Sequence, residues 1–465
     1  MSSVSISNSI VVRMNLPAGG MVVSDLTAAV EREGGQVTAL DVSSSSSEVL
    51  QVDLTISSSG PEHADRLVEA LRAIDDVEVS KVSDRTFLMH LGGVIETRSK
   101  HALRNRDDLS MIYTPGVARI CRAIAEDRED ARRLTIKRNS VAVVTDGSAV
   151  LGLGNIGPEA ALPVMEGKAA LFKTFADIDA WPLCLDTQDV EQIIETVAAV
   201  APGFAGINLE DISAPRCFEI EARLRERLDI PVFHDDQHGT AVVVLAALRN
   251  ALRVVGKELP TARIVLVGAG AAGTAVLKVL LHAGAVDVVV CDVAGVVHAG
   301  RPDLDPSLVW TAEHTNPQGL TGALRDVLPG ADVFIGVSAP NLIDADDVEA
   351  MADDSIVFAL ANPDPEIDPA IARRHAAVVA TGRSDHPNQI NNVLAFPGIF
   401  RGLLDAHSHG IGMDVLTAAA DAIADSVSDD ERGPNYIIPS VFHADVHQKV
   451  AAAVEAAGTR EEEQR

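Results

Sequence analysis

The chain has 465 residues, of which 47% are hydrophobic and 23% charged, so a globular protein of two or three domains is expected. Its 38 Lys and Arg against 67 Asp and Glu give a formal net charge of −29, which disfavours nucleic-acid and membrane-surface partners but not a local positive pocket for an anionic metabolite. The four cysteines lack CxxC spacing, and no signal-peptide pattern or apolar run of about 18 residues occurs, so a cytoplasmic protein is predicted.

The first 90 residues predict a small α/β unit. Amphipathic helical patterns cover 25–33 and 63–74, strand patterns cover 7–14, 36–42, 49–56 and 77–82, and the serine run 43–47 predicts a hairpin loop. The order βαββαβ is that of the ferredoxin-like split βαβ unit. In this the segment resembles an ACT domain, which implies a regulatory module that binds a small effector, such as an amino acid, between two copies. A dimerisation module without a ligand is an equal alternative.

Strands and helices alternate over 91–256 and again over 257–397, and 398–465 is mostly helical with a polar end, 459–465, that is expected to fray. The second alternation opens with an apolar strand, the glycines Gly268, Gly270 and Gly273, a helix and a second strand that ends at Asp292. This context predicts a Rossmann-type turn, whose glycines let the backbone approach a pyrophosphate at the helix N-terminus. Asp292 can bind both ribose hydroxyls, which favours NAD over NADP, although Arg301 is a nearby cation that could reverse the preference.

A second GxGxxG pattern lies at Gly152, Gly154 and Gly157. Pro158 and Pro163 interrupt the helix that should follow it, and no strand with an acidic tip comes at the right distance. A glycine-rich active-site loop is therefore favoured over a second nucleotide site.

Acidic residues follow two short strands of the first alternation. Glu210 and Asp211 follow one strand, and Asp235 and Asp236 follow the next. Ligands bind at the carboxyl ends of strands in open α/β sheets, and acids gathered there suit a hard divalent ion, Mg²⁺ or Mn²⁺. His234 and His238 could ligate a transition metal, but local hydrogen bonding is favoured because oxygen ligands already suffice.

Two further residues gain meaning only in combination. Lys168 is predicted at a glycine-marked helix start, where the positive charge of the helix N-terminus and of a nearby metal would lower the pKa of the lysine into the range of a general base. Taken alone, Lys168 would be a solvated surface lysine, and Tyr113, one of only two tyrosines, would be a packing residue.

Together these clusters resemble the malic enzyme family, in its smaller bacterial form with an ACT-like extension. The matching motifs are YTPGVA (113–118), VTDG (144–147), GLGNIG (152–157), EGK (166–168), LED (209–211), HDDQHGTA (234–241), GAGAAG (268–273), ALANP (359–363) and Asn391-Asn392. The resemblance implies an α/β protein with an ACT-like domain (1–90), a substrate and metal domain (91–256), a Rossmann-type NAD domain (257–397) and a C-terminal helical segment (398–465). It also implies oxidative decarboxylation of L-malate to pyruvate and CO₂ with NAD(P)⁺ and Mg²⁺ or Mn²⁺, in a homo-oligomer.

The resemblance also implies roles for single residues. Glu210, Asp211 and Asp236 would be metal ligands, Lys168 the general base supported by Asp235, and Tyr113 the acid that protonates the enolpyruvate carbon. Asn362, Asn391 and Asn392 would bind the substrate carboxylate or the nicotinamide ribose. One position departs from the family, because Ala149 stands where larger members carry an arginine that binds a malate carboxylate.

Three alternatives stay open. A malolactic enzyme would retain the reduced cofactor and release lactate. A metabolite sensor with a degenerate catalytic body would bind ligands without turnover. An amino-acid dehydrogenase with an ACT domain would not need the metal carboxylates, so EDTA would leave its activity intact.

Overall fold

The computed structural model describes residues 5–18 and 23–464. The chain divides into two compact units, Met1–Glu96 and Thr97–Arg465. Each unit has its own hydrophobic core.

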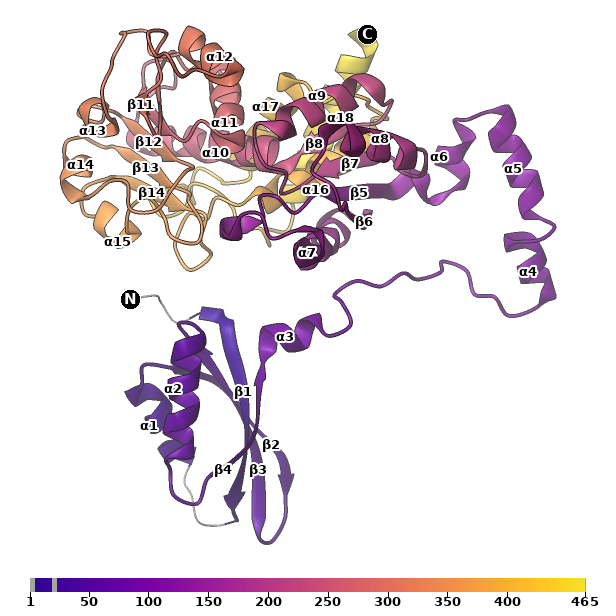
Figure 1. Ribbon diagram of the computed structural model, residues 1–465, viewed down its shortest axis with the longest axis vertical. Coiled ribbons are helices and arrows are strands. Elements are labelled where there is room, and N and C mark those ends of the chain that lie inside the picture. Colours follow the sequence, from indigo (N-terminus) through magenta and orange to yellow (C-terminus); the bar gives the residue numbers. More distant parts are fainter. Residues whose placement is uncertain (1–4, 19–22, 465) are drawn as a thin grey trace. The chain divides into compact units, whose positions relative to one another are not determined.

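The N-terminal unit has the predicted βαββαβ order. Its elements are β1 (Ser5–Pro17), α1 (Val23–Arg32), β2 (Gln36–Ser45), β3 (Val49–Ser58), α2 (Pro61–Arg72), β4 (Glu78–Asp84) and a short α3 (Arg85–His90). The strands form an antiparallel sheet in the order β2-β3-β1-β4, with α1 and α2 on one face (Figure 1). Val12 and Leu54 point to the inner face of the sheet and are fully buried with Leu26 and Leu67 in one core.

The serine run differs from its prediction. Ser44 and Ser45 pair with Gln51 and Leu50, so β2 continues through the first half of the run and the hairpin loop is shorter than expected. The ladder hydrogen bonds of this antiparallel pair outweigh the weak intrinsic strand preference of serine.

The second unit begins with helices and a four-stranded parallel sheet. In chain order its elements are α4 (Arg106–Ile112), α5 (Val117–Glu126), α6 (Asp130–Leu134), η1 (Ile136–Asn139), β5 (Ser140–Thr145), η2 (Leu151–Leu153), α7 (Pro158–Ala176), β6 (Asp179–Cys184), α8 (Val190–Val200), η3 (Ala201–Gly203), β7 (Gly206–Leu209), α9 (Arg216–Arg227), β8 (Val232–His234) and α10 (Asp235–Val255). The sheet order is β6-β5-β7-β8. The central strands β5 and β7 are buried along their whole length, as continuous apolar strands of parallel sheets are.

A six-stranded sheet follows. Its elements are β9 (Arg263–Val267), α11 (Ala271–His282), β10 (Asp287–Asp292), β11 (Gly295–Val296), α12 (Pro306–His314), α13 (Leu324–Val327), β12 (Val333–Gly336), α14 (Ala345–Glu349), β13 (Ile356–Ala359), α15 (Pro369–Ala372) and β14 (Val378–Thr381). The order β11-β10-β9-β12-β13-β14 is parallel except for the edge strand β11. Alternate residues of β9 enter different cores, Ile264 on one face and Val265 on the other, so both faces of the sheet are covered.

The chain ends in η4 (Asn392–Leu394) and three helices, α16 (Phe396–Asp405), α17 (Met413–Ala424) and α18 (Val446–Gln464). A Cβ at Gly402 would overlap the carbonyl oxygen of Ala451, so this glycine permits the close contact of α16 with α18. The frayed tail predicted for 459–465 is wrong as far as Gln464, and Arg465 lies outside the described residues. The helix is held because Glu462 accepts a 2.8 Å hydrogen bond from the backbone N–H of His409.

One helix in the described part of the chain, α10, is long and apolar enough to cross a bilayer by length and composition. Two thirds of its apolar stretch is buried inside the fold, as expected of a core helix that packs against both sheets.

Candidate active site

Three carboxylates meet at the carboxyl ends of β7 and β8. Glu210 and Asp211 follow β7, Asp236 lies in the first turn of α10, and one oxygen from each lies within 4.8 Å of the others. The predicted metal residues are therefore brought together from two strand ends. Burial, and to a lesser degree the charge of Asp236, raise the pKa of Glu210, with Lys168 acting in the opposite direction. Three acids in so small a space, all offering oxygen, fit a hard divalent cation.

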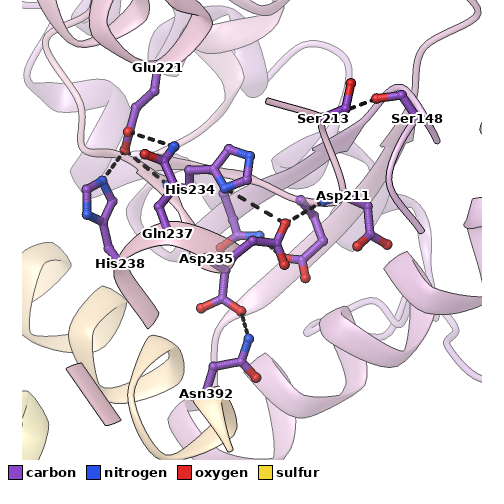
Figure 2. A network of polar contacts seen from close by, with 12 residues as sticks. Ser148, Asp211, Ser213, Glu221, His234, Asp235, Gln237, His238 and Asn392 are labelled. Carbon is purple, nitrogen blue, oxygen red and sulfur yellow. Dashed lines mark hydrogen bonds and ion pairs between the residues drawn. The ribbon is translucent and has the colours of Figure 1, made fainter. Parts of the chain in front are cut away.

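The position of Asp211 depends on backbone contacts. Its φ of 54° is in the left-handed region, which Asp tolerates better than most residues. Its N–H donates to Asp236 Oδ2 at 2.9 Å, and its carbonyl accepts from the N–H of Ala149 at 2.9 Å. The segment after β5 thus supports these carboxylates, and Ser148 Oγ accepts a 2.9 Å hydrogen bond from the N–H of Ser213 (Figure 2).

Lys168 is buried near the middle of α7, not at a helix start as predicted, because the helix continues through Pro163. Its Nζ lies 2.5 Å from Asp235 Oδ2, 2.9 Å from Glu210 Oε1 and 4.1 Å from the centroid of the Phe396 ring. Burial alone would lower the pKa of Lys168, but the two carboxylates outweigh it and raise that pKa. The protein's own charges therefore raise this pKa, and the predicted lowering, which depends on a metal, stays a prediction.

Asp235 connects Lys168 to the C-terminal region. Burial raises the pKa of Asp235 to about 6, against the opposing charge of Lys168. The amide of Asn392 donates to Asp235 Oδ2 (Figure 2). Asp235 is completely buried and holds the lysine ammonium in a defined position.

The two histidines surround a different carboxylate. Glu221 of α9 is buried and accepts from His238 Nε2 at 2.7 Å, from the N–H of His234 at 3.1 Å and from Gln237 Nε2 at 3.3 Å (Figure 2). Among the described residues, the group of converging side chains that could hold a metal contains neither histidine. Both instead take part in local hydrogen bonding, which the sequence analysis favoured. His234 Nδ1 lies 3.8 Å from Asp236 Oδ2, so this buried ring borders the metal carboxylates without binding them directly.

The Rossmann turn has the predicted geometry. Gly268 has a φ of 108°, and a Cβ at Gly273 would overlap the carbonyl oxygen of Gly268, so both positions require glycine. Gly270 faces open space, and a cavity of about 990 Å³ borders Gly268, Gly270 and Asp292. A dinucleotide fits here, because the open backbone at the start of α11 admits a pyrophosphate.

Asp292 ends β10 and is held in place by two donors. Its Oδ1 accepts from the N–H of Ala294 and from Arg301 Nη1, both at 2.8 Å. Arg301 also pairs with Asp303 at 2.6 Å. Two carboxylates thus neutralise the nearby cation, which removes the main argument against NAD.

The second glycine turn is a loop that leads into α7. A Cβ at Gly152 would lie 3.0 Å from both the carbonyl oxygen of Asn362 and Pro363 Cδ. A Cβ at Gly382 would lie 3.0 Å from Asn362 Nδ2. The loop therefore packs against Asn362, and its role as an active-site loop stays a prediction. Asn391 caps η4, where its side chain accepts from the N–H of Val393 at 3.0 Å.

Tyr113 is not brought to this cluster. It is the C-cap residue of α4 and is 67% exposed, and its hydroxyl has no hydrogen bond to any residue that the structure describes. No residue of α4 or α5 is buried.

Sequence reasoning missed three residues of the site. Asn208 donates to Glu210 Oε2 at 2.9 Å. It lies two residues before Glu210, and residues at this spacing along an extended segment share a face, so the contact could have been predicted from the sequence. Phe396 beneath Lys168 and Glu221 beneath the histidines come from distant helices, and no local pattern marks them.

Gly239 supports a first testable prediction. A Cβ at this position would overlap Asp235 Oδ1, so Gly239→Ala is expected to move Asp235 and cost about 1–3 kcal/mol of folding stability through overpacking. We expect turnover to fall together with the thermal midpoint, measured by calorimetry. Gly167→Ala is the control, because nothing lies within 4 Å of its Cβ position. Equal stability and turnover of the two variants would contradict the prediction.

Comparison with known families identifies both halves of the second unit. Residues 92–225 match the malic enzyme N-terminal domain, and residues 237–458 match the malic enzyme NAD binding domain. The chain is 56% identical to the NAD-dependent malic enzyme of Geobacillus stearothermophilus, over 97% of this chain and 94% of that protein. It is 54% identical to the bifunctional malic/malolactic enzyme of Bacillus subtilis, over 78% and 89% of the two chains.

A solved structure agrees with these matches. The crystal structure of NAD-dependent malic enzyme from Thermotoga maritima superposes with a TM-score of 0.78 at 50% identity, covering 80% of this chain and 99% of that one.

Proposed function

Because the chain belongs to the malic enzyme family, we propose that it converts L-malate and NAD⁺ to pyruvate, CO₂ and NADH. The observation that carries the proposal is the buried ion pair of Lys168 with Asp235 beside three convergent carboxylates. A base, an acidic metal site and a Rossmann turn are the parts that this reaction needs.

Glu210, Asp211 and Asp236 would hold Mg²⁺ or Mn²⁺. When bound, the ion supplies Lewis-acid polarisation of the C2 oxygen of malate, and NAD⁺ accepts a hydride from C2. Asn208 fixes the side chain of Glu210, and the N–H of Asp211 fixes that of Asp236. These contacts preorganise the carboxylates before a ligand arrives.

Lys168 would accept the hydroxyl proton of malate. If Glu210 held a cation, its charge would no longer be available to Lys168, so the pKa of Lys168 would be lower than in the ion pair with both carboxylates. Asp235, anchored by Asn392, keeps Nζ in place during the transfer. Oxidation at C2 gives a β-keto acid, which loses CO₂ readily, and a proton must then reach C3.

We propose Tyr113 as the donor of that proton, supplied to each site by a second copy of the chain. Its exposure, and that of Leu109, Met111 and Ile112 on the same helix, supports an interface that covers α4 in a homo-oligomer. Mixing Tyr113→Phe subunits with Lys168→Ala subunits is expected to restore activity, because one site of the mixed dimer is intact. Persistent inactivity of exchanged subunits would contradict this.

Asn362 and Asn391 are proposed to bind the substrate carboxylate or the nicotinamide ribose, together with Asn392. Asn362 is exposed and lies between the glycine loop and Gly382, which suits a ligand contact. Asn392 already donates to Asp235, so its second role requires its remaining polar atoms. These amides would bind the malate carboxylate that an arginine binds in larger family members, since Ala149 at the matching position cannot.

Asp292 supports a prediction on cofactor choice. Asp292→Ser removes a charge that repels a 2′-phosphate and leaves Arg301 with one partner, Asp303. We expect the ratio of kcat/KM for NADP⁺ to that for NAD⁺ to rise by about 100-fold, or about 2.7 kcal/mol of differential binding. Asp287→Ser, at the start of the same strand, is the control. An unchanged ratio would show that Asp292 does not select the cofactor.

Residues 1–90 are proposed to be an ACT-like regulatory or oligomerisation domain that binds a small effector. The βαββαβ order supports this, and so does the match to the Geobacillus protein, which extends through most of this region. We also propose a cytoplasmic location, which the four free cysteines support.

The test is malate-dependent NADH formation with Mn²⁺, with and without EDTA, followed by assay of pyruvate and lactate. NADH and pyruvate that appear together and disappear with EDTA would establish the reaction. The likeness to a bifunctional malic/malolactic enzyme keeps malolactic conversion as a second candidate. Lactate without free NADH would favour it, and no turnover with either cofactor would overturn both.

A further inference from the structure

A small basic pocket lies at the opposite end of the β5–β8 sheet from the carboxylates. Its volume is about 90 Å³, and Arg132, Arg138, Arg401, Asp405 and His407 border it. Arg138 lies just before β5, and Ala205, also at the pocket, lies just before β7. Because a parallel strand rises about 3.3 Å per residue, the pocket is about 16 Å from Glu210 at the far end of β7.

The pocket gathers positive charge in a strongly acidic chain. Arg401 is fixed by Asp405, at 2.8 and 2.6 Å, and by Asn139 Oδ1 at 2.7 Å. The guanidinium groups of Arg132 and Arg138 have no ion pair or hydrogen bond with any described residue. Burial lowers the pKa of the neighbouring Lys137, and the charge of Arg132 adds to this effect while that of Asp229 opposes it. Three arginines against one aspartate leave a local formal charge of about +2.

We propose that this pocket binds a phosphoryl group, either free phosphate or the phosphate of a small monoester. Guanidinium groups bind phosphate oxygens through paired N–H donors, and a phosphate monoester carries close to two negative charges at neutral pH. The volume accommodates one tetrahedral anion and no attached nucleoside. The remainder of a monoester would extend into solvent.

Helix α16 connects the pocket to the catalytic cluster. Arg401 and Asp405 lie in its second half, and Phe396 at its start contacts Lys168. Arg401 is about 8 Å along the helix from Phe396. Asn392, four residues before Phe396, bonds to Asp235. An anion that joins η1 to α16 would therefore stabilise the positions of Phe396 and Asn392, which contact Lys168 and Asp235. We expect phosphate to lower the KM for malate as a result, and this expectation rests on the proposed function.

The test is calorimetric titration of the full chain with inorganic phosphate, and separately with glycerol 3-phosphate. Ionic strength is held constant with chloride, metal is omitted, and saturating NAD⁺ keeps phosphate from the Rossmann turn. We expect binding that R132Q/R138Q weakens at least tenfold. Arg133→Gln is the matched control, because this neighbour on α6 is 72% exposed, pairs with Asp130 and does not border the pocket. The single variant R138Q, at an exposed position, guards against misfolding of the double variant.

Two results would overturn the site. One is equal phosphate binding by the parent chain and by R132Q/R138Q, and the other is no binding at phosphate concentrations up to about 20 mM. Tighter binding of glycerol 3-phosphate than of free phosphate would identify a monoester as the preferred ligand, and the reverse would identify phosphate. Malate kinetics are measured afterwards with Mn²⁺. A KM that falls about fivefold with phosphate only when both arginines are present supports the coupling through α16. Phosphate binding without a fall in the KM for malate would overturn the coupling through α16 but not the site. Failure of the proposed function would appear as phosphate binding without any turnover of malate.

Discussion

Replacing Lys168 by alanine is expected to lower kcat for malate oxidation by about 10³-fold, within the range of a lost general base. Lys168 Nζ is the cation nearest to both Asp235 and Glu210, and its helix holds it 6% exposed beside the metal carboxylates. No other ammonium among the described residues contacts these two acids. Steady-state NADH formation measures the effect, and NAD⁺ affinity, measured by fluorescence, should stay unchanged.

The control for this variant is Lys173→Ala. Lys173 lies five residues farther along the same helix, is 55% exposed and pairs with Asp177 and Asp179 at the surface. It should keep full activity. Added small primary amines should restore part of the rate of Lys168→Ala, which a merely structural loss would not allow. A rate within tenfold of the parent enzyme would contradict the role of Lys168 as the base.

Substituting Asp236 by asparagine is expected to weaken Mn²⁺ binding by about 100-fold or more, the upper range seen even for residues that only support metal ligands. Asp236 supplies one of three carboxylates within 4.8 Å of one another. Asparagine removes the charge but keeps an oxygen that can accept the 2.9 Å hydrogen bond from the N–H of Asp211. The fold should therefore be retained. Free Mn²⁺, measured by electron paramagnetic resonance, reports affinity independently of turnover.

Asp186→Asn is the matched control for the metal site. Asp186 also follows a strand of the same sheet, β6, but it is exposed and does not belong to the convergent carboxylates. It should bind Mn²⁺ as the parent chain does. If Asp236→Asn and Asp186→Asn bound the ion equally well, the carboxylates at β7 and β8 would not be the metal site.

Features carried by short stretches could be predicted. The Rossmann turn is visible because Gly268, Gly270 and Gly273 act through backbone geometry within six residues, and Asp292 follows at a fixed distance. The convergence of Glu210, Asp211 and Asp236 was predictable because parallel strands end at one edge of a sheet.

The environment of Lys168 could not be predicted in the same way. Its predicted place at a helix start was wrong, because α7 tolerates Pro163 near its N-terminus and continues to Ala176. The protein's own charges raise its pKa, since Asp235 and Glu210 come from other segments of the chain. Charge effects of this kind depend on distances between atoms that are 42 to 67 positions apart in the chain.

The sequence by itself determined the βαββαβ order, the nucleotide turn and the identity of the acids at the strand ends, because each follows from local periodicity, backbone freedom or the direction of a strand. Only the tertiary structure decided that Phe396 lies beneath Lys168, that Asn392 anchors Asp235 and that Arg138 meets Arg401 at a basic pocket. These contacts join segments far apart in sequence, and packing of α16 against the sheet, which no local pattern encodes, brings them together.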